Sequence, residues 1–446
     1  MKRITYLILV LIVFLGGFLR IYNLSESPPS LNWDEAALGY NAYSISKTLK
    51  DEYGKVLPIF TRSFDEYKST LPLYLMIPSI KIFGLNEFGV RLPSALMGTL
   101  TIVLIFLLAR QIFRDERIAL ISSFVFAIEP WAVHLSRVYQ EANTANFFLL
   151  LGLLLFLYSQ KRHKLLPFSI LSFLLSMYTY NANKLLIPLF LGVLVVLNAG
   201  NLRQYSKKVL KVSLSILILF LFAFVVLVFT GQALARAGST NIFILWPRTQ
   251  VLQFLIEKHS VSSLADFLLH NQFFYFIWEL VGRYFAYFSP HNLFLREPQE
   301  PSTILVGNSI FHPFEFIPWI IGLIYITRNI KKHKEFLALL LLSPVPAIIT
   351  WNWFQPGRVM SLFAVFSILV GIGTVKLFEY LRIKKLLYLS LVVYGLVAAF
   401  YLFDAINIQL PTRDSGNWQP GFRETVPVVV EFEKDYDQVI IETPHA

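Results

Sequence analysis

The sequence predicts an all-α polytopic membrane protein. Of its 446 residues, 56% are apolar and only 15% are charged, and the mean hydropathy is +0.59. Soluble proteins carry about 25% charged residues, so this chain has to be interpreted with the bilayer as its solvent. Its apolar residues also gather into runs close to the roughly 20 residues that a spanning helix needs. A soluble fold, a disordered chain and a coiled coil are excluded.

Eleven apolar segments are candidates for transmembrane helices, so about eleven such helices are expected. Several are shorter than 20 residues and depend on neighbouring helices to shelter their ends. The segments are 5–18, 92–109, 118–133, 144–158, 165–180, 185–197, 209–229, 316–327, 336–350, 359–378 and 386–403. No small-residue cleavage site comes before Arg20. The first segment is therefore expected to stay as a helix and not to be removed as a signal peptide.

The positive residues decide the orientation. If the N-terminus is inside, all five short basic connections fall on the cytoplasmic side. These connections are 110–117, 161–164, 203–211, 328–334 and 382–385. Together with Lys2 and Arg3 they hold 19 of the 39 Lys and Arg residues, as the positive-inside rule requires. The net charge of +11 is therefore a topology signal. The lipid bilayer is the expected partner, and nucleic acid is excluded.

Three segments outside the membrane are long enough to carry chemistry. Two are loops of the membrane domain (1–404), namely a first outer loop (23–91) and a second large outer loop (230–315); the third is an extracytoplasmic C-terminal segment (405–446). The cytoplasmic connections are too short for a nucleotide site, and the chain contains no P-loop or dinucleotide motif. It also has no Cys, which excludes disulfides, thiolate zinc sites and Cys nucleophiles.

The first outer loop predicts an amphipathic helix that lies in the membrane interface. After the Pro28-Pro29 turn, apolar residues recur at spacings of four and three. These residues are Leu38, Ala42, Ile45 and Leu49. The acidic pair Asp34-Glu35 stands at the N-terminus of this helix, at the level where lipid headgroups meet water.

The acidic pair has two interpretations. Asn32 precedes it as an N-cap, and Glu35 completes a capping box three residues later, while an acid in the first turn complements the helix dipole. Alternatively, the pair is catalytic. Adjacent helical residues do not face each other, so one acid would then be the base and the other would orient it. The residues alone leave both interpretations open.

Four basic residues are expected at or near the outer surface of the membrane. Lys68 precedes an apolar, Pro-containing segment, and Arg91 lies at the mouth of the second helix; snorkelling to the interface would explain either one. Glu141 follows Arg137 by four residues, a spacing typical of a helical ion pair. Arg358 stands at a helix mouth after the external turn W-N-W-F-Q-P-G.

No metal site and no cofactor motif is predicted. His134, His291 and His312 are dispersed along the chain without an H-x-x-x-H pair, which argues against zinc hydrolysis. A divalent metal is left open.

In their order along the chain, these residues resemble glycosyltransferase family 39, within the GT-C superfamily. This family includes protein O-mannosyltransferases and lipid A aminoarabinose transferases. The matching features are the acidic pair after the first helix, K-x-x-x-P at Lys68, R-L-P-S-A-L from Arg91, Glu129-Pro130, Ser136-Arg137 with Glu141, Y-F-S-P from Tyr287, and Arg358. The resemblance covers about residues 1–440.

The resemblance implies a GT-C fold and inverting transfer of a sugar from a polyprenyl phosphate to an acceptor outside the membrane. The position of the family's catalytic base is Asp34, and Glu35 matches its companion acid. Lys68 matches the phosphate-contacting Lys, although three residues separate it here from Pro72, where relatives usually have Lys followed directly by Pro.

A leaving phosphate needs cations around it. Arg91, Arg137 and Arg358, together with Lys68, are therefore expected to bind the donor phosphate. Glu141 is a candidate second acid that faces the site.

The sequence thus predicts a membrane-bound hexosyl- or pentosyltransferase whose acceptor is a protein, a lipid or an envelope glycan. The alternative is a transporter or flippase of a lipid-linked sugar, and a lipid-linked oligosaccharide polymerase or ligase is a third reading. Transporter sites lie near the bilayer midplane, often between repeats, whereas here the polar residues crowd the outer edge. The expected location is a bacterial cytoplasmic membrane, with the active site on the extracytoplasmic side. Relatives often carry a larger domain after the last helix, so 405–446 is expected to be part of one.

Overall fold

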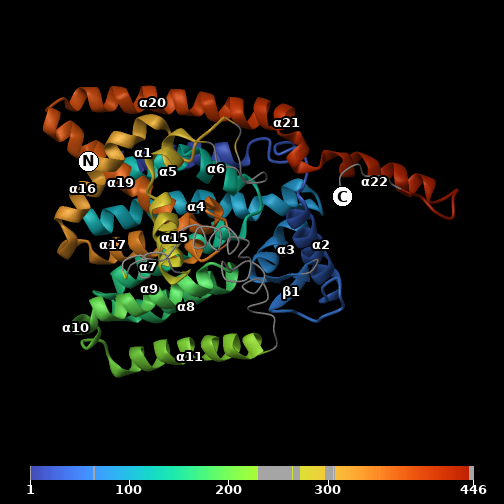
Figure 1. The fold of residues 1–446 in the computed structure, drawn as a ribbon, viewed down its shortest axis with the longest axis horizontal. Helices are drawn as coiled ribbons and strands as arrows, with labels where there is room; N and C mark the ends of the chain where they lie inside the picture. Colours follow the sequence, from blue (N-terminus) through green and yellow to red (C-terminus); the bar gives the residue numbers. More distant parts are fainter. Residues whose placement is uncertain are drawn as a thin grey trace.

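The computed structural model describes residues 2–63, 66–229, 264, 272–296, 305, 307–350 and 352–440. Most of these residues lie in helices, and the longer helices are stacked side by side as a bundle (Figure 1). In the described part of the chain, the only sheet is an antiparallel hairpin of β1 (Phe60–Ser63) and β2 (Glu66–Ser69). The all-α class is therefore confirmed.

All eleven apolar segments are helical over most of their length. In chain order, the helices of the bundle are α1 (Lys2–Ile21), α4 (Glu87–Phe113), α5 (Glu116–Ile128), α6 (Pro130–Arg137), α7 (Glu141–Ser159), α8 (Leu166–Thr179), α9 (Asn183–Leu197), α11 (Lys207–Phe229), α15 (Gln272–Ala286), α16 (Phe316–Arg328), α17 (Lys334–Leu342), α18 (Val345–Ile348), α19 (Met360–Leu381) and α20 (Lys384–Asp404). Among the described residues, six helices are long and apolar enough to cross a membrane alone, and the bent pair α5–α6 makes a seventh span. The segments predicted at 165–180, 185–197, 316–327 and 336–350 are occupied by the shorter helices α8, α9, α16 and α17–α18.

The remaining elements lie in loops and in the C-terminal segment. The first outer loop carries α2 (Trp33–Thr48), the hairpin and α3 (Leu71–Phe83). The C-terminal segment carries a π-helical turn (Ala405–Gln409), α21 (Leu410–Arg413), a 3-10 turn (Ser415–Trp418) and α22 (Pro420–Phe432). Other short elements are α10 (Ala199–Leu202), the 3-10 turns His163–Leu165, Pro313–Glu315, Ile330–Lys332 and Pro356–Val359, and the π-helical turn His291–Leu295. Most of the second outer loop lies outside the described residues.

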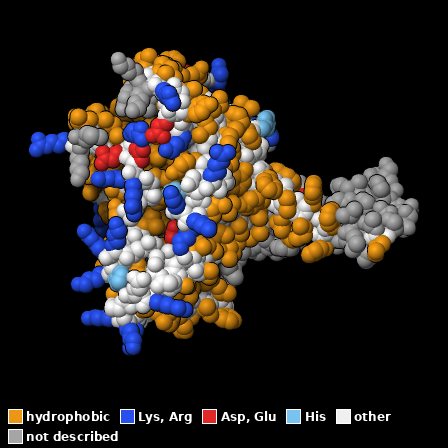
Figure 2. Space-filling model, turned by 90° about the vertical axis from the view of Figure 1, so that its left-hand side faces the viewer, with side chains coloured by type: hydrophobic (Ala, Val, Ile, Leu, Met, Phe, Trp, Pro, Cys, Tyr) orange, Lys and Arg blue, Asp and Glu red, His pale blue; other side chains and the backbone are white. Residues whose placement is uncertain are grey.

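The two ends of the bundle differ in charge. The N-terminus and α10 lie at one end, here called the basic end, whereas α2, α3 and the C-terminal helices lie at the other, here called the loop end (Figure 1). Figure 2 shows Lys and Arg side chains gathered on the face at the basic end, with few acids among them. Arg117 pairs there with Asp115 at 2.7 Å and with Glu379 at 2.6 Å. The positive-inside rule predicts this charge distribution for a cytoplasmic end.

Helix α2 is the amphipathic helix predicted in the first outer loop. Its apolar residues Leu38, Ala42 and Ile45 are buried, and Leu38 and Ala42 pack in one cluster with residues of α3. Trp33, Tyr40 and Tyr43 are the large apolar side chains that α2 exposes, at 62%, 51% and 38%. Leu38 and Ala42 of the predicted stripe therefore pack α2 against α3, whereas Leu49, the last residue of that stripe, is the exposed C-cap of α2.

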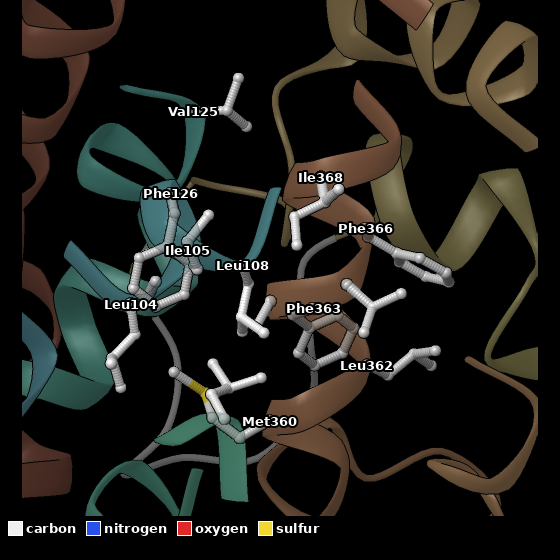
Figure 3. Close-up of a cluster of buried hydrophobic side chains, with 14 of the residues drawn as sticks. Leu104, Ile105, Leu108, Val125, Phe126, Met360, Leu362, Phe363, Phe366 and Ile368 are labelled. Carbon is white, nitrogen blue, oxygen red and sulfur yellow. The ribbon is translucent and has the colours of Figure 1, made fainter. Parts of the chain in front are cut away.

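Helix α19 forms the centre of the bundle. All of its residues from Met360 to Val375 are buried, and its side chains face those of α4 and α5 (Figure 3). Helix α16 packs closest to it: a Cβ added to Gly373 would lie only 1.7 Å from the carbonyl oxygen of Pro318. Helices in membranes commonly use small residues to let their backbones approach in this way.

The α5–α6 pair bends by 57° beside Glu129. Pro130 has no N–H and cannot donate to the carbonyl oxygen of Phe126, as helix geometry would require. The fully buried Arg20 of α1 donates instead to the carbonyl oxygens of Phe126 (3.0 Å) and Ala127 (2.8 Å). The apolar pattern predicts one span at 118–133, and it reveals neither the bend nor this role of Arg20.

We expect Gly373→Ala to lower the melting temperature of the purified protein in detergent. The added methyl group would collide with the backbone of α16, and overpacking of this kind costs about 1–3 kcal/mol. Gly192→Ala in α9 is the matched control, because nothing lies within 4 Å of a Cβ at that position. Equal melting temperatures for the two variants would contradict the close packing of α16 on α19.

The topology can be tested with reporter fusions at the two ends of α20. The basic residues at 382–385 should keep the start of α20 in the cytoplasm, so a reporter that is active only outside the cytoplasm should be silent after Lys385. The same reporter fused after Asp404 should be active. The reverse pattern would overturn the orientation and would place Asp34 inside the cell.

Candidate functional site

The first turn of α2 presents Asp34 at the loop end of the bundle. The side chain of Asn32 accepts a hydrogen bond from the Glu35 N–H (2.9 Å), and the Asn32 N–H donates to Glu35 Oε2 (3.2 Å), so the predicted capping box is confirmed. The side chain of Asp34 is 44% exposed and accepts a hydrogen bond from Lys68 Nζ, whose side chain is 5% exposed. The hairpin, in which Lys68 lies opposite Thr61, thus places a cation against the one exposed acid of the pair.

Glu35 is buried in an ion pair with Arg91 of α4. Arg91 Nε donates to Oε1 at 2.9 Å and its second terminal nitrogen, Nη2, donates to Oε2 at 3.1 Å, while the Tyr139 N–H donates to Oε1 at 2.9 Å. Neither side chain of the ion pair has any exposed surface. Glu35 therefore orients the first turn of α2 and is out of reach of a substrate.

The other N–H groups of Arg91 hold the chain that leads into α2. They donate to the carbonyl oxygens of Leu24 (3.2 Å), Pro28 (2.8 Å) and Ser30 (2.5 Å). With the two bonds to Glu35, all five N–H groups of the guanidinium have acceptors. Arg91 was expected to bind the donor phosphate, but its donors are committed to the protein itself.

Arg137 acts on the same stretch of chain and is only 1% exposed. It donates to four backbone carbonyl oxygens, those of Leu19 (2.9 Å), Tyr22 (2.8 Å), Asn23 (3.2 Å) and Ser27 (2.7 Å). These bonds turn its terminal nitrogens away from any surface that a lipid phosphate could reach. Through these hydrogen bonds, Arg91 and Arg137 together hold residues 19–30 against the bundle.

Glu141 does not share a helix with Arg137, because Arg137 ends α6 and Glu141 begins α7. The spacing of four residues between them therefore does not produce a helical ion pair. Glu141 is half-buried close to Tyr139. Burial raises the pKa of Tyr139 well above its ordinary value, and the carboxylate of Glu141 adds to this effect. Since the Tyr139 N–H binds Glu35, Glu141 lies near the acidic pair.

Arg358 lies on a different element, half-buried in the turn Pro356–Val359 that leads into α19. Its backbone N–H donates to the carbonyl oxygen of Gln355 at 3.1 Å, and the Gln355 N–H donates to the hydroxyl of Tyr287 at 2.9 Å. The structure thus brings Asp34 to Lys68 and Glu35 to Arg91, whereas the turn that carries Arg358 is bonded through Gln355 to Tyr287 of the second outer loop. Within the described residues, no group of three His, Asp or Glu side chains is arranged to hold a metal ion.

A cavity of about 310 Å³ opens beside the hairpin. Its walls are almost entirely apolar and come from the first outer loop, α8 and α11. The lining residues are Ile59, Thr70, Leu71, Tyr74, Leu175, Tyr178, Leu219, Phe220 and Ala223. Thr70 follows Lys68 by two residues, so the cavity begins close to the cation. Its composition suits a hydrocarbon chain.

Trp418 is a further residue of the site that the sequence analysis missed. It comes from the C-terminal segment and is fully buried. Its ring lies over the guanidinium of Arg91, 5.9 Å from Cζ to the ring centroid, and meets the ring of His134 edge-on at 5.9 Å. The only signal in the sequence is a Trp within an otherwise polar stretch, which does not reveal its partner.

Comparison with known proteins identifies relatives for part of the chain. Residues 68–228 match the family model of dolichyl-phosphate-mannose-protein mannosyltransferase. The chain is 29% identical over 171 residues to a putative mannosyltransferase, YkcB, of Bacillus subtilis, and 30% identical over 145 residues to dolichyl-phosphooligosaccharide-protein glycotransferase 2 of Archaeoglobus fulgidus. These alignments cover 37% and 30% of this chain but only 22% and 23% of the two relatives. The matches therefore span less than a quarter of each relative.

Two solved structures share the architecture of almost the whole chain. ArnT from Cupriavidus metallidurans bound to undecaprenyl phosphate aligns with a TM-score of 0.57 at 13% identity, over 99% of this chain and 81% of that one. AglB from Archaeoglobus fulgidus, in complex with an inhibitory peptide and a dolichol-phosphate, aligns with a TM-score of 0.55 at 16% identity, over 93% of this chain and 56% of that one. The family model supports the resemblance noted in the sequence over residues 68–228, and the two structures support it for the fold. The chain is a polytopic membrane protein that shares the fold of ArnT and AglB.

Proposed function

We propose that the protein transfers a sugar from a polyprenyl-phosphate carrier to an acceptor outside the membrane, with inversion at the anomeric carbon. The observation that carries this proposal is the pair formed by Asp34 and Lys68, a half-exposed carboxylate and a cation from separate elements. The pair lies at the loop end of the bundle, and Thr70, two residues after Lys68, lines an apolar cavity. The lipid phosphates named in the ArnT and AglB structures support a donor of the same chemical class.

Asp34 is the general base of the proposed reaction. As the acceptor oxygen attacks C1 of the sugar, its proton passes to the Asp34 carboxylate. The bond between C1 and the phosphate oxygen breaks, and its electron pair leaves with the phosphate. The phosphate then carries two negative charges in place of one, so a preorganised cation stabilises the transition state more than the ground state. Lys68 is placed to supply this charge, and its move to the phosphate releases Asp34.

The four cations divide into two roles in this proposal. Lys68 and Arg358 contact the donor phosphate. Arg91 and Arg137 are positioning residues, because their terminal N–H groups already bind Glu35 and backbone carbonyl oxygens. Glu141, close to Tyr139, remains the candidate second acid.

The apolar cavity supports a lipid-linked donor. A polyprenyl tail needs apolar surface, and each methylene removed from water contributes about 0.8 kcal/mol. The outer parts of α8 and α11 provide such surface in the cavity that Thr70 also lines. A donor whose phosphate meets Lys68 could therefore direct its first isoprene units into this cavity.

Transport of a lipid-linked sugar is the competing function. A transporter would hold its substrate near the bilayer midplane, whereas Asp34 and Lys68 lie at the loop end of the bundle. We place the reaction on the extracytoplasmic side of a bacterial cytoplasmic membrane, in agreement with the basic residues at the opposite end. Vesicles containing the purified protein separate the two functions: sugar attached to an acceptor supports transfer, and donor moved across the vesicle without a product supports transport.

Asp34→Asn is expected to lower sugar transfer by about 10²–10⁴-fold, since the amide keeps the size of the side chain but cannot accept the proton. The measurement is mass spectrometry of the cell envelope in a deletion strain: wild type should restore the sugar that deletion removes, and the variant should not. Glu52→Gln removes a charge from the same loop and still offers an oxygen to Asn41, with which Glu52 now bonds at 2.7 Å. It should restore the sugar. Full restoration by Asp34→Asn would leave the acidic pair with a structural role alone.

Arg358→Lys is expected to reduce the turnover number at least about tenfold, a barrier change of about 1.4 kcal/mol. Lys reproduces poorly the planar, two-pronged contact of Arg with a phosphate. The loss should appear in kcat more than in KM, because the phosphate charge grows during the reaction. Arg296→Lys, at an exposed position in the second outer loop, is the matched control and should retain wild-type rates. Wild-type kinetics in Arg358→Lys would remove Arg358 from the phosphate site.

A further inference from the structure

We infer that Trp418 is a positioning residue of this site: by covering Arg91 it keeps Glu35, and with it the first turn of α2 that carries Asp34, in one arrangement. Trp418 belongs to the C-terminal segment and follows Arg91 by 327 residues in the sequence. The catalytic consequence rests on the proposed function, whereas the ordering of the loop can be measured without it.

The surroundings of Trp418 connect it to Arg91. Trp418 is the largest side chain in the described structure with less than 2% exposure. It shares a small apolar cluster with Val138 and Leu410, and its Nε1 donates to Asp414 at 3.4 Å. The face of the indole lies over the Arg91 guanidinium, within the distance at which a cation and an aromatic ring attract each other.

Residues before and after Trp418 form a hydrogen bond and ion pairs with the first outer loop. Ser27 Oγ donates to the carbonyl oxygen of Ile406 at 2.5 Å. Beyond Trp418, Arg423 lies 3.7 Å from Glu26 and 3.6 Å from Glu87, at the start of α4. The C-terminal segment therefore contacts residues 26–29 and the mouth of α4 on both sides of the buried Trp.

Arg91 needs this cover for a physical reason. Its ion pair with Glu35 and its bonds to the Leu24 and Pro28 carbonyl oxygens have no exposed surface, and water that reached them would compete for each donor. Without the indole, one side of the guanidinium would face a cavity or solvent. Residues 24–35 would then open more often, and Asp34 would spend less time in register with Lys68. Trp418 itself has no exposed surface, so it acts through Arg91 and not on a substrate.

The opening of the loop can be measured directly because the natural chain has no Cys. Ser30→Cys places one thiol beside the carbonyl group that Arg91 binds, at a position only 6% exposed. A buried thiol reacts with N-ethylmaleimide only when the segment opens. We expect Trp418→Ala to raise the labelling rate of this Cys at least about tenfold in the full-length protein in detergent.

Trp319→Ala is the matched control for the loss of a large buried ring. Trp319 is 4% exposed and packs against Phe294 and Phe366 in the bundle core. In the Ser30→Cys protein, Trp319→Ala should change the rate of labelling by no more than about twofold, even if it lowers the melting temperature. Trp418→Phe keeps an aromatic face over Arg91 and should restore most of the protection.

Sugar transfer provides the second measurement. Per folded molecule, Trp418→Ala should lower kcat about 10–100-fold with little change in KM, because a misplaced base slows the chemical step and leaves donor binding in place. Trp418→Phe should recover most of the rate, and Trp319→Ala should keep it.

The outcomes are distinct. An unchanged labelling rate in Trp418→Ala overturns the inference whether or not transfer is observed. Faster labelling in both Trp418→Ala and Trp319→Ala also overturns it, because the effect would then be general loosening. Faster labelling confined to Trp418→Ala supports it even if the wild-type protein transfers no sugar, in which case only the proposed function fails. Faster labelling of Trp418→Ala with an unchanged kcat would overturn the claim that opening of residues 24–35 displaces Asp34.

Discussion

The buried ion pair between Arg91 and Glu35 is the constraint on which the site depends. Two opposite charges without contact to water are stable only when every donor and acceptor around them is satisfied, and here the five N–H groups of Arg91 all have acceptors. Leaving one partner of such a pair unpaired costs about 3–5 kcal/mol. The pair therefore fixes the approach of the first outer loop to α4, and the exposure of Asp34 follows from the burial of its neighbour.

The bundle provides the rigid frame for this loop. Helix α19 is buried over most of its length and meets α16 through Gly373, so the helices beneath the loop have little freedom to separate. The bend between α5 and α6 then sets the direction of Arg137, the last residue of α6. Because Arg20 donates to the Phe126 carbonyl group that Pro130 leaves without a partner, and to the adjacent carbonyl group of Ala127, the bend is stabilised by the bundle.

Local patterns were readable from the sequence, and contacts between distant residues were not. Apolar runs predicted the helices because a bilayer imposes length and composition on each segment separately, and the capping box of Asn32 and Glu35 could be recognised because its partners are three residues apart. Asp34 was identified with Glu35, but only the fold shows that one acid is exposed and the other buried. The sequence predicts phosphate contacts for Arg91 and Arg137, because a sequence does not reveal which N–H donors are already bound within the protein. Trp418 was missed for the same reason.

The two arginines that hold the first outer loop bind it mainly through its main chain. Apart from Glu35, their acceptors are the carbonyl oxygens of residues 19, 22, 23, 24, 27, 28 and 30. Every amino acid presents the same carbonyl group, so substitutions at most of these seven positions leave the number of acceptors unchanged. The arginines have no such freedom, because no other side chain offers five donors in one plane. In this part of the fold, sequence divergence should therefore accumulate in the segment that is held, while the residues that hold it change little.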